Sequence, residues 1–365
     1  MKEGWTYRRL EDVCSIDYGT RVVQKKDKGS KYYVYGGGGA TFMVDSYNRE
    51  DCFIVSRFAM SPKCTRYVKG KFFLNDSGLS VSTTTPRLSQ NFVDKALLAN
   101  NDTIYSFGKG MAQRNLDIPS FRNLIIPVPP LPEQERIVAE LDLLTGIIDK
   151  QKAQLKELDT LAQSIFYDMF GDPVENEKGW DVKKLSDIGK VITGNTPSTK
   201  DDKNYSSDDY CFVKPSDIAK DGISIISDSE YHISAYGYEN SRKLPKGSIL
   251  TTCIGIIGKV GILSISATCN QQINAIIPKN SLESLYVAYC IIGKRKTLES
   301  MANAPVVPII NKGDFSNISI PVPPLSLQQS FAQKIQSIES QKASINRSIA
   351  ETQKLFDYTM DKYFG

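Results

Sequence analysis

The feature that most constrains the fold of this chain is a proline-rich segment that occurs twice. IPVPPLPEQERI begins at Ile126, and IPVPPLSLQQSF begins 194 positions later, at Ile320. Proline fixes φ and keeps the residue before it extended, so each copy predicts a stiff, polyproline-like exit from a strand. Because the connector is written twice, we expect a duplicated unit of domain size.

Apolar residues follow each proline segment at intervals of four and three. They are Ile137, Leu141, Leu144, Ile148, Leu155 and Leu158 in the first copy, and Phe331, Ile335, Ile338, Ile345, Ile349 and Phe356 in the second. This heptad pattern predicts two helices of about 39 residues, each roughly 58 Å long. One interpretation packs each helix on its neighbouring domain. We favour the other, in which the two apolar seams meet in an antiparallel coiled coil.

The parts before the helices are also related. GWTYRRLEDV at the start is matched by GWDVKKLSDI 175 positions later, so the second globular part carries about 19 more residues than the first. Short β-rich runs between Gly, Asn, Asp and Ser turns predict a mixed α/β (α+β) fold for both. The expected division is domain 1 (1–127), connector and helix 1 (128–171), domain 2 (172–321), and connector and helix 2 (322–365).

Composition and sequence patterns argue against several classes of protein. No run of eighteen apolar residues is present and the N-terminus has no apolar signal core, so we expect no membrane span and a cytoplasmic protein. Seven scattered cysteines without a CxxC pair are expected to be reduced core thiols. The single histidine, His232, would have to serve every histidine-dependent site, and it is interpreted as a polar loop residue.

No motif for bond-making chemistry stands out. YGGGGATF, from Tyr35 to Phe42, lacks the GxGxxG spacing, and GIIGKVG, from Gly255 to Gly261, lacks the spacing and the Ser/Thr of a P-loop. No Asn-Pro-Pro-aromatic tetrapeptide of methyltransferases occurs either. The chain is therefore expected to have no catalytic residues and no metal site.

Charge is distributed unevenly. Residues 1–127 hold 19 Lys/Arg against 12 Asp/Glu, a net charge of +7, whereas residues 132–171 carry a net charge of −4. Tyrosines lie among the basic clusters of both domains. Lys and Arg with interleaved aromatic and amide side chains suit a surface that follows phosphates and reaches base edges.

Taken together, the repeated IPVPP segment, the long helix ending in Phe-Gly, the GW…L…D…G opening of each domain, and the stretches TGNTPS and AQRNL resemble the specificity (S) subunit of type I restriction–modification systems. The resemblance covers essentially the full chain, in the order recognition domain, helix, recognition domain, helix. DYGTRV in domain 1 departs from TGNTPS in domain 2.

The resemblance implies a non-catalytic subunit that reads a bipartite, asymmetric site in double-stranded DNA, one half-site for each domain, with the coiled coil as spacer. It also implies two methylation (M) subunits around the helices and restriction (R) subunits beyond them. S-adenosylmethionine, ATP and Mg²⁺ would belong to these partners and no cofactor to this chain. The expected DNA contacts are Arg21, Arg57, Arg66, Gln113, Arg114, Asn195, Thr196, Lys214, Arg242 and Lys259.

Two other functions compete with this one. A self-contained nuclease or methyltransferase is disfavoured by the missing motifs. A coiled-coil adaptor whose globular ends bind proteins, without DNA specificity, is the alternative that the residues alone leave open.

Overall fold

The computed structural model describes residues 4–302 and 307–365, which form two compact units. Unit 1 comprises Met1–Lys152 and Asn346–Gly365, and unit 2 comprises Ala153–Ile345. Each long helix contributes residues to both units. The predicted four-part division along the sequence stays a prediction. The two units divide the chain in another way, since the residues of each long helix cluster with the globular parts that they contact.

Two helices of 40 residues each follow the proline connectors, α6 (Leu131–Phe170) and α12 (Leu325–Phe364). In unit 1, Arg136 donates a hydrogen bond to Tyr363 over 3.0 Å, and Gln151 donates one to Ser348 over 2.7 Å. The partner in α12 therefore moves toward the N-terminus of that helix as α6 advances, which makes the pair antiparallel.

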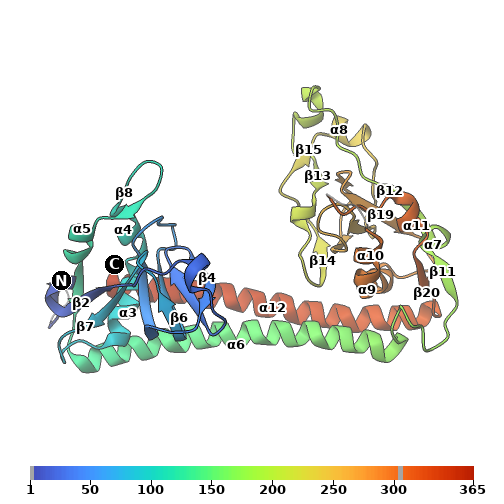
Figure 1. Ribbon diagram of the computed structural model, residues 1–365. Helices are drawn as coiled ribbons and strands as arrows, with labels where there is room; N and C mark the ends of the chain where they lie inside the picture. Colours follow the sequence, from blue (N-terminus) through green and yellow to red (C-terminus); the bar gives the residue numbers. More distant parts are fainter. Residues whose placement is uncertain (1–3, 303–306) are drawn as a thin grey trace. The chain divides into compact units, whose positions relative to one another are not determined.

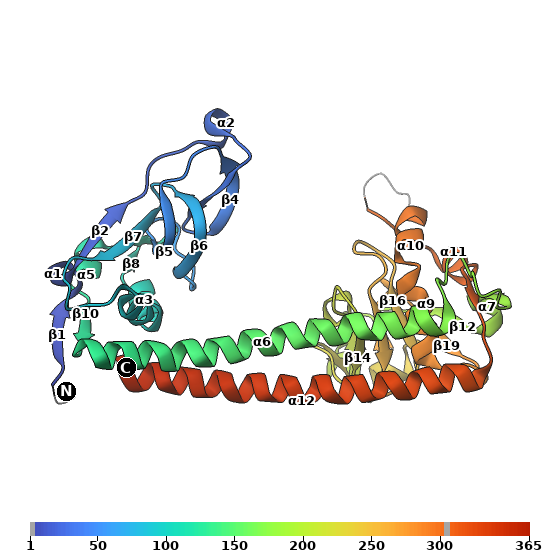
Figure 2. The same ribbon diagram turned by 90° about the horizontal axis from the view of Figure 1, so that it is seen from below.

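The same direction holds in unit 2. Lys342 pairs with Asp159 at 2.8 Å, and the rings of Phe331 and Phe166 have centroids 5.6 Å apart. Within each unit, both views show the two helices side by side (Figures 1 and 2). The antiparallel coiled coil predicted from the heptads is confirmed.

The predicted seam is the buried face of both helices. Ile137, Leu141, Phe331 and Ile335 are at most 1% exposed, Leu144, Ile148 and Ile338 are also buried, and the other predicted seam residues are half-buried. Ile137 and Leu141 belong to the core of domain 1, and Phe331 and Ile335 to that of domain 2. The helices thus pack on each other, as we favoured, and also on the globular domains. The seam residues take part in both kinds of contact.

In unit 1 the largest sheet has six strands in the order β2-β7-β5-β6-β3-β4. Helix α3 packs on β6 and β7, between the sheet and α6 (Figure 2). The elements before α6 are β1 (Thr6–Arg9), α1 (Leu10–Val13), β2 (Cys14–Tyr18), α2 (Gln24–Asp27), β3 (Tyr32–Gly36), β4 (Gly39–Val44), β5 (Arg49–Ser56), β6 (Thr65–Leu74), β7 (Gly78–Thr83), α3 (Gln90–Ala99), α4 (Asn101–Ser106), β8 (Gly108–Lys109), β9 (Asn115–Leu116), α5 (Ile118–Arg122) and β10 (Ile125–Val128).

In unit 2 the strands form a five-stranded sheet, β12-β19-β16-β17-β14, and a three-stranded sheet, β15-β13-β18. The elements between the long helices are β11 (Val182–Lys184), α7 (Leu185–Ile188), β12 (Gly189–Thr193), β13 (Tyr210–Val213), β14 (Ile223–Ile226), β15 (His232–Ile233), α8 (Ala235–Glu239), β16 (Ile249–Thr252), β17 (Val260–Leu263), β18 (Thr268–Cys269), β19 (Ile273–Pro278), α9 (Ser284–Gly293), α10 (Arg295–Met301), α11 (Lys312–Ser316) and β20 (Ser319–Pro321), with 3-10 turns η1 (Asp202–Tyr205) and η2 (Pro215–Asp217).

The two domains share a set of paired strands and helices, which we call the frame. The first strand pairs antiparallel with the strand before the proline connector, β1 with β10 and β11 with β20. The next strand pairs with the strand before the largest helix of the domain, β2 with β7 and β12 with β19. Helices α3 and α9 begin 194 residues apart, as do α4 and α10 and as do α5 and α11. The duplication predicted from sequence is therefore visible element by element.

A buried glutamine ties this frame to each long helix. Gln134 is fully buried, accepts a hydrogen bond from the Ser89 amide over 2.8 Å, and donates to the Arg87 and Pro129 carbonyls. The residue 194 positions later, Gln328, is also fully buried. It accepts from the Glu283 amide over 3.0 Å and donates to the Pro323 carbonyl over 2.8 Å.

The domains differ in the segment inserted between the two paired strands of the frame. In domain 1 the insert is residues 19–77, which supply β3 to β6 of a single sheet. In domain 2 it is residues 194–272, which are spread over two sheets. The unequal domain lengths expected from the two sequence offsets arise in this insert.

Two further expectations concern the ends of the helices and the thiols. Helix α6 ends at Phe170, and Gly171 follows with φ of +78°, a conformation that glycine adopts without a steric penalty. All seven cysteines are unpaired, and all but Cys52 are buried, as predicted. Over the described residues, none of the helices combines the length and the apolar character needed to cross a bilayer.

Candidate nucleic-acid interface

Three predicted contact residues of domain 1 lie on segments that hydrogen bonds join. The Arg66 guanidinium donates to the Gly37 carbonyl over 3.0 Å. The segment that contains Arg57 is bound to the strand after Arg114, because the Leu116 amide donates to the Arg57 carbonyl over 2.8 Å. The Met60 amide donates in turn to the Arg114 carbonyl over 2.9 Å. The fold therefore brings residues far apart in sequence into one group of turns.

Aromatic rings orient two of these guanidinium groups. Arg57 lies 4.8 Å from the ring centroid of Tyr18 and 4.4 Å from that of Phe58. Arg114 lies 4.5 Å from the ring of Tyr105, and its guanidinium also donates to the Gly108 carbonyl. A planar guanidinium held over a ring loses less conformational freedom when it binds a base or phosphate than a free side chain does.

The other two predicted residues of domain 1 are exposed. Arg21 is exposed in the segment after β2, and Gln113 is exposed in the turn between β8 and β9. Figure 1 shows this turn projecting from unit 1. Both side chains are free to reach a ligand.

In domain 2 the fold brings together Asn195, Thr196 and Arg242. The Asn195 side chain accepts from the Arg242 amide over 2.8 Å, and the Arg242 guanidinium donates to the Thr193 carbonyl over 2.7 Å. Thr196 donates to the side-chain oxygen of Gln271 over 2.6 Å. These contacts fix the loop that contains TGNTPS, while the Arg242 and Thr196 side chains stay exposed.

The two predicted lysines of domain 2 have different surroundings. The Lys214 ammonium, directly after β13, lies 3.0 Å from the ring centroid of Tyr231. The Lys259 ammonium donates to the carbonyls of Pro215 and Ile218, each over 2.7 Å. Lys259 thus closes the η2 turn, and two of its three ammonium donors are already engaged within the domain.

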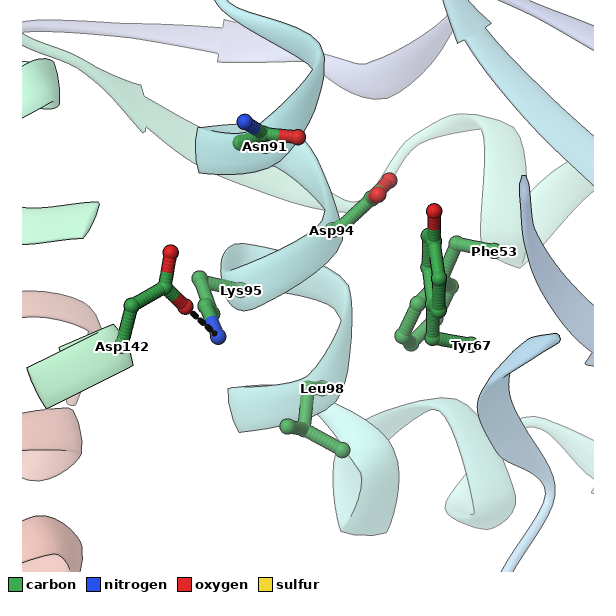
Figure 3. Close-up of a pocket in the computed structure, with 7 residues that line it drawn as sticks. All are labelled: Phe53, Tyr67, Asn91, Asp94, Lys95, Leu98 and Asp142. Carbon is green, nitrogen blue, oxygen red and sulfur yellow. Dashed lines mark ion pairs between the residues drawn. The ribbon is translucent and has the colours of Figure 1, made fainter. Parts of the chain in front are cut away.

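A pocket of about 300 Å³ lies beside α3 in unit 1. Figure 3 shows Asp94 reaching toward Phe53 and Tyr67, while Lys95 turns to the opposite side of the helix and pairs with Asp142 at 2.6 Å. Burial raises the pKa of Asp94 to about 6, although Gln90 donates a hydrogen bond to it over 2.7 Å. The lining contains neither a thiol nor an imidazole; besides Asp94, its ionisable groups are the Lys95–Asp142 ion pair and the Tyr67 phenol.

The described residues thus define a class of protein, a duplicated two-domain binder. Each domain joins a shared frame to the same pair of antiparallel helices and presents loops that contain Arg, Lys, Asn and Gln. Comparison with known proteins agrees with this class. The family model of the type I restriction modification DNA specificity domain matches residues 2–160 and again residues 177–353. Because these matches cover most of the chain, it belongs to this family, and the family predicted from sequence is confirmed.

Curated relatives have the same family name. The chain is 32% identical over 164 residues to the type I restriction enzyme HindI specificity subunit of Haemophilus influenzae, covering 44% of this chain and 36% of that protein. It is 27% identical over 265 residues to the type I restriction enzyme EcoR124I/EcoR124II specificity subunit of Escherichia coli, covering 67% and 64%. The match thus spans little more than a third of the length of the first relative and about two thirds of the second.

Two solved structures share the fold. The type I restriction–modification S subunit from M. genitalium gives a TM-score of 0.60 at 15% identity, covering 99% of this chain and 96% of that one. A chain from work on complex assembly and conformational transition of the type I R-M system gives 0.61 at 18% identity, covering 100% and 98%. The mixed fold with two domains and paired helices is therefore confirmed.

Sequence reasoning missed one group of converging side chains and the role of the buried glutamines. His232, interpreted as an isolated polar residue, lies in β15 beside Cys211 and Asp228. Cys211 is 21 positions earlier in the chain, and only the pairing of β13 with β15 brings it to His232. The repeated glutamine was detectable, since Gln134 and Gln328 occupy equal places in the two proline–helix segments.

Proposed function

We propose that this chain is the non-catalytic DNA-reading subunit of a type I restriction–modification complex. Domain 1 would read one half of a bipartite, asymmetric site in double-stranded DNA, and domain 2 the other half. The observation that carries the proposal is the division of each domain into a shared frame and a different insert. The frame packs on the helices, whereas most predicted contact residues lie in the inserts.

The chemistry of the inserts, and of the turn between β8 and β9, supports base reading. Arginine binds the O6 and N7 acceptors of guanine with two donors, and asparagine or glutamine does the same for adenine. Arg57 and Arg114 are held by aromatic rings, and Arg21 and Gln113 are accessible. The net charge of +7 over residues 1–127 favours attraction to phosphates.

The coiled coil would serve as the spacer between the half-sites. Each helix continues without interruption through 40 residues, which corresponds to about 60 Å at 1.5 Å per residue. Bases on one face of a duplex recur about every 34 Å, so a rigid spacer would make half-site separation part of the recognised sequence. Two methylation subunits would bind around these helices, with restriction subunits beyond them. S-adenosylmethionine, ATP and Mg²⁺ would be bound by those partners, in the cytoplasm where the DNA lies.

A domain exchange tests the division of labour. Residues 1–127 are replaced by the first domain of another family member, and the methylated sites of cells that express the chimera with its methylation partner are sequenced. We expect one half-site to change while the other half-site and the spacer are retained. A change in both half-sites, or in neither, would contradict the assignment of one half-site to each domain.

A charge reversal tests the contact surface. Arg21→Glu in the insert is compared with Arg122→Glu, an exposed position on α5 of the frame that undergoes the same change in charge. We expect the first variant to bind the specific duplex at least tenfold more weakly and to lower the salt slope by about one if Arg21 meets a phosphate. Equal loss in both variants would show a nonspecific charge effect. Absence of DNA binding by the wild-type complex at low salt would favour the adaptor function.

A further inference from the structure

Three side chains of different chemistry, none of them a predicted DNA contact, converge in unit 2. They are Cys211 in β13, Asp228 in the segment between β14 and β15, and His232 in β15. The Cys211 Sγ lies 3.5 Å from Asp228 Oδ1 and 3.7 Å from His232 Nε2, and Nε2 lies 2.9 Å from Oδ1. Over residues 4–302 and 307–365, this is the group of thiol, imidazole and carboxylate atoms close enough to share an ion.

The fold holds two of the three in register. Strands β13 and β15 pair antiparallel with Cys211 directly opposite His232, so the two side chains extend from the same face of the sheet. The Asp228 side chain is held by the backbone of the next residue, since its Oδ1 accepts a hydrogen bond from the Ser229 amide over 2.9 Å. Cys211 is buried, the His232 side chain is 25% exposed, and the Asp228 side chain is 77% exposed. The group thus lies at the surface with one open side.

The geometry excludes a Cys-His-Asp catalytic relay. In such a relay the nucleophile and the carboxylate bond to different ring nitrogens, so that one accepts the proton while the other orients the ring. Here both the thiol and the carboxylate approach Nε2. The three groups meet at one point instead of forming a line.

We propose that Cys211, Asp228 and His232 bind a divalent transition metal, of which Zn²⁺ fits best. Metal–ligand bonds of about 2.3 Å to sulfur and 2.0–2.2 Å to nitrogen or oxygen place tetrahedral ligands about 3.4–3.6 Å apart. The two distances from Cys211 match this spacing, and the His232–Asp228 distance needs to open by about half an ångström. A thiolate and an imidazole select zinc over Mg²⁺ or Ca²⁺, which prefer oxygen ligands.

The metal dication displaces the proton of the Cys211 thiol to solvent and is bound by the resulting thiolate, by the Asp228 carboxylate and by the Nε2 lone pair of a neutral His232 that keeps its proton on Nδ1. Water completes the fourth position on the exposed side. No oxidant, reductant or co-reactant is required.

Such an ion would fix a part of the insert of domain 2. It would tie β13 and β15 to the segment before β15, where Tyr231 and Lys214 contact each other beside His232 and Cys211. Domain 1 has no counterpart among its described residues. The metal site is therefore a property of one insert and not of the shared frame.

The test uses the full chain, freed of metal with a chelator and then titrated with Zn²⁺ in competition with a chromogenic chelator. One Zn²⁺ per chain is expected. Cys211→Ser and His232→Gln are expected to weaken the affinity at least tenfold, whereas Cys52→Ser, which removes a half-buried thiol of unit 1, should leave it unchanged. Co²⁺ should give a thiolate-to-metal charge-transfer band in the wild type and in Cys52→Ser but not in Cys211→Ser.

Asp228→Asn separates loss of a metal ligand from loss of folding. The side chain is exposed and the change is nearly isosteric, so the variant should fold as the wild type does. This variant should match the wild type in circular dichroism without metal and bind Zn²⁺ at least tenfold more weakly. Zinc binding by the wild type no tighter than by Cys211→Ser and Asp228→Asn would overturn the proposal. So would less than a tenth of an equivalent of zinc bound at micromolar concentration.

Discussion

Domains 1 and 2 share a frame and differ in almost everything that the frame presents. Phe121 and Phe315 are fully buried at equivalent places, as are Ile126 and Ile320. Between the paired frame strands, however, domain 1 builds one six-stranded sheet and domain 2 divides its strands between two. The frame is constrained because it packs on the helices. The insert only has to begin and end at two paired strands of the frame. Under the proposed function, this division would let recognition vary without disturbing assembly.

The largest expected effect is on the seam, at Phe331 and its counterpart Ile137. Phe331 lies 5.6 Å from Phe166, 5.4 Å from Phe170 and 5.0 Å from Tyr289 by ring centroids. Phe331→Ala is expected to destabilise unit 2 by about 3–5 kcal/mol, and Ile137→Ala to destabilise unit 1 by about 2–5 kcal/mol. Hydrogen exchange resolves the units: amides of α9 should exchange faster in the first variant and amides of α3 in the second.

The control for this pair is Gln333→Ala, an exposed change on the same helix as Phe331. Its effect should stay within about 0.5 kcal/mol. Faster exchange in both units after either substitution would show that the units do not unfold separately. It would contradict the assignment of Ile137 to the core of domain 1 and of Phe331 to the core of domain 2.

The buried glutamines come next. Gln134→Leu leaves the Ser89 amide and the Arg87 and Pro129 carbonyls without this partner, and Gln328→Leu leaves the Glu283 amide and the Pro323 carbonyl. A buried polar group without a partner costs about 1–3 kcal/mol, so Gln134→Leu should be the more damaging. Thermal unfolding of both variants beside Gln333→Leu measures the difference. Equal stability of all three would mean that the glutamines do not join frame and helix.

A pH-dependent difference is expected at Asp94, whose counterpart in domain 2 is the fully buried Ala288. The pKa of Asp94 is raised by burial from 3.8 to about 6, so the folded protein holds this proton over a range in which the unfolded chain has lost it. The contribution of Asp94 to stability is therefore lost as pH rises from about 4 to 6. Asp94→Asn can still accept from Gln90 and should be more stable than the wild type above pH 6, by roughly 1–3 kcal/mol.

Unfolding of wild type and Asp94→Asn at pH 4 and pH 7.5 measures this difference. The variant should be more stable than the wild type at pH 7.5, and this difference in stability should disappear at pH 4. A gain that is the same at both values would show that the carboxylate is not the group responsible.

The smallest effect concerns one further pair of equivalent positions. Lys95 pairs with Asp142 in domain 1, whereas Tyr289 stands at the place of Lys95 in domain 2 and stacks on Phe166. Because Asp142 is largely exposed, Asp142→Asn should cost less than about 1 kcal/mol and its effect should vanish at 1 M salt. Tyr289→Ala should cost several times more at any salt concentration. A salt-independent loss in Asp142→Asn would contradict the ion-pair account.

The elements that the sequence predicted well are those with a local or repeated signal. The heptads located the seam, and Pro129, Pro130 and Gly171 marked the helix ends, because proline and glycine act on their own backbone conformation. The repeat predicted the duplication, which the equivalent elements of the two domains show. The frame strands were not identified as pairs, since β1 and β10 are more than a hundred residues apart and each has an ordinary composition.

Contact residues were harder to predict, because charge alone does not show what a side chain will meet inside the fold. Lys259 has the same sequence signal as Arg242, but its ammonium is bound to two carbonyls of the η2 turn. Arg57 and Arg114 gained support from rings that no local pattern would have placed beside them. The group at His232 depends on strand pairing and could not be found by spacing. The predicted DNA contacts stay predictions.

The most direct test of the account is binding as a function of half-site separation. The chain in complex with its methylation partner is titrated against duplexes that contain both half-sites, as identified from genomic methylation, with the spacer shortened or lengthened by one and two base pairs. Continuous paired helices predict one preferred spacer and a loss of at least tenfold for a change of one base pair. Equal affinity across the series would contradict a fixed spacer between the two domains.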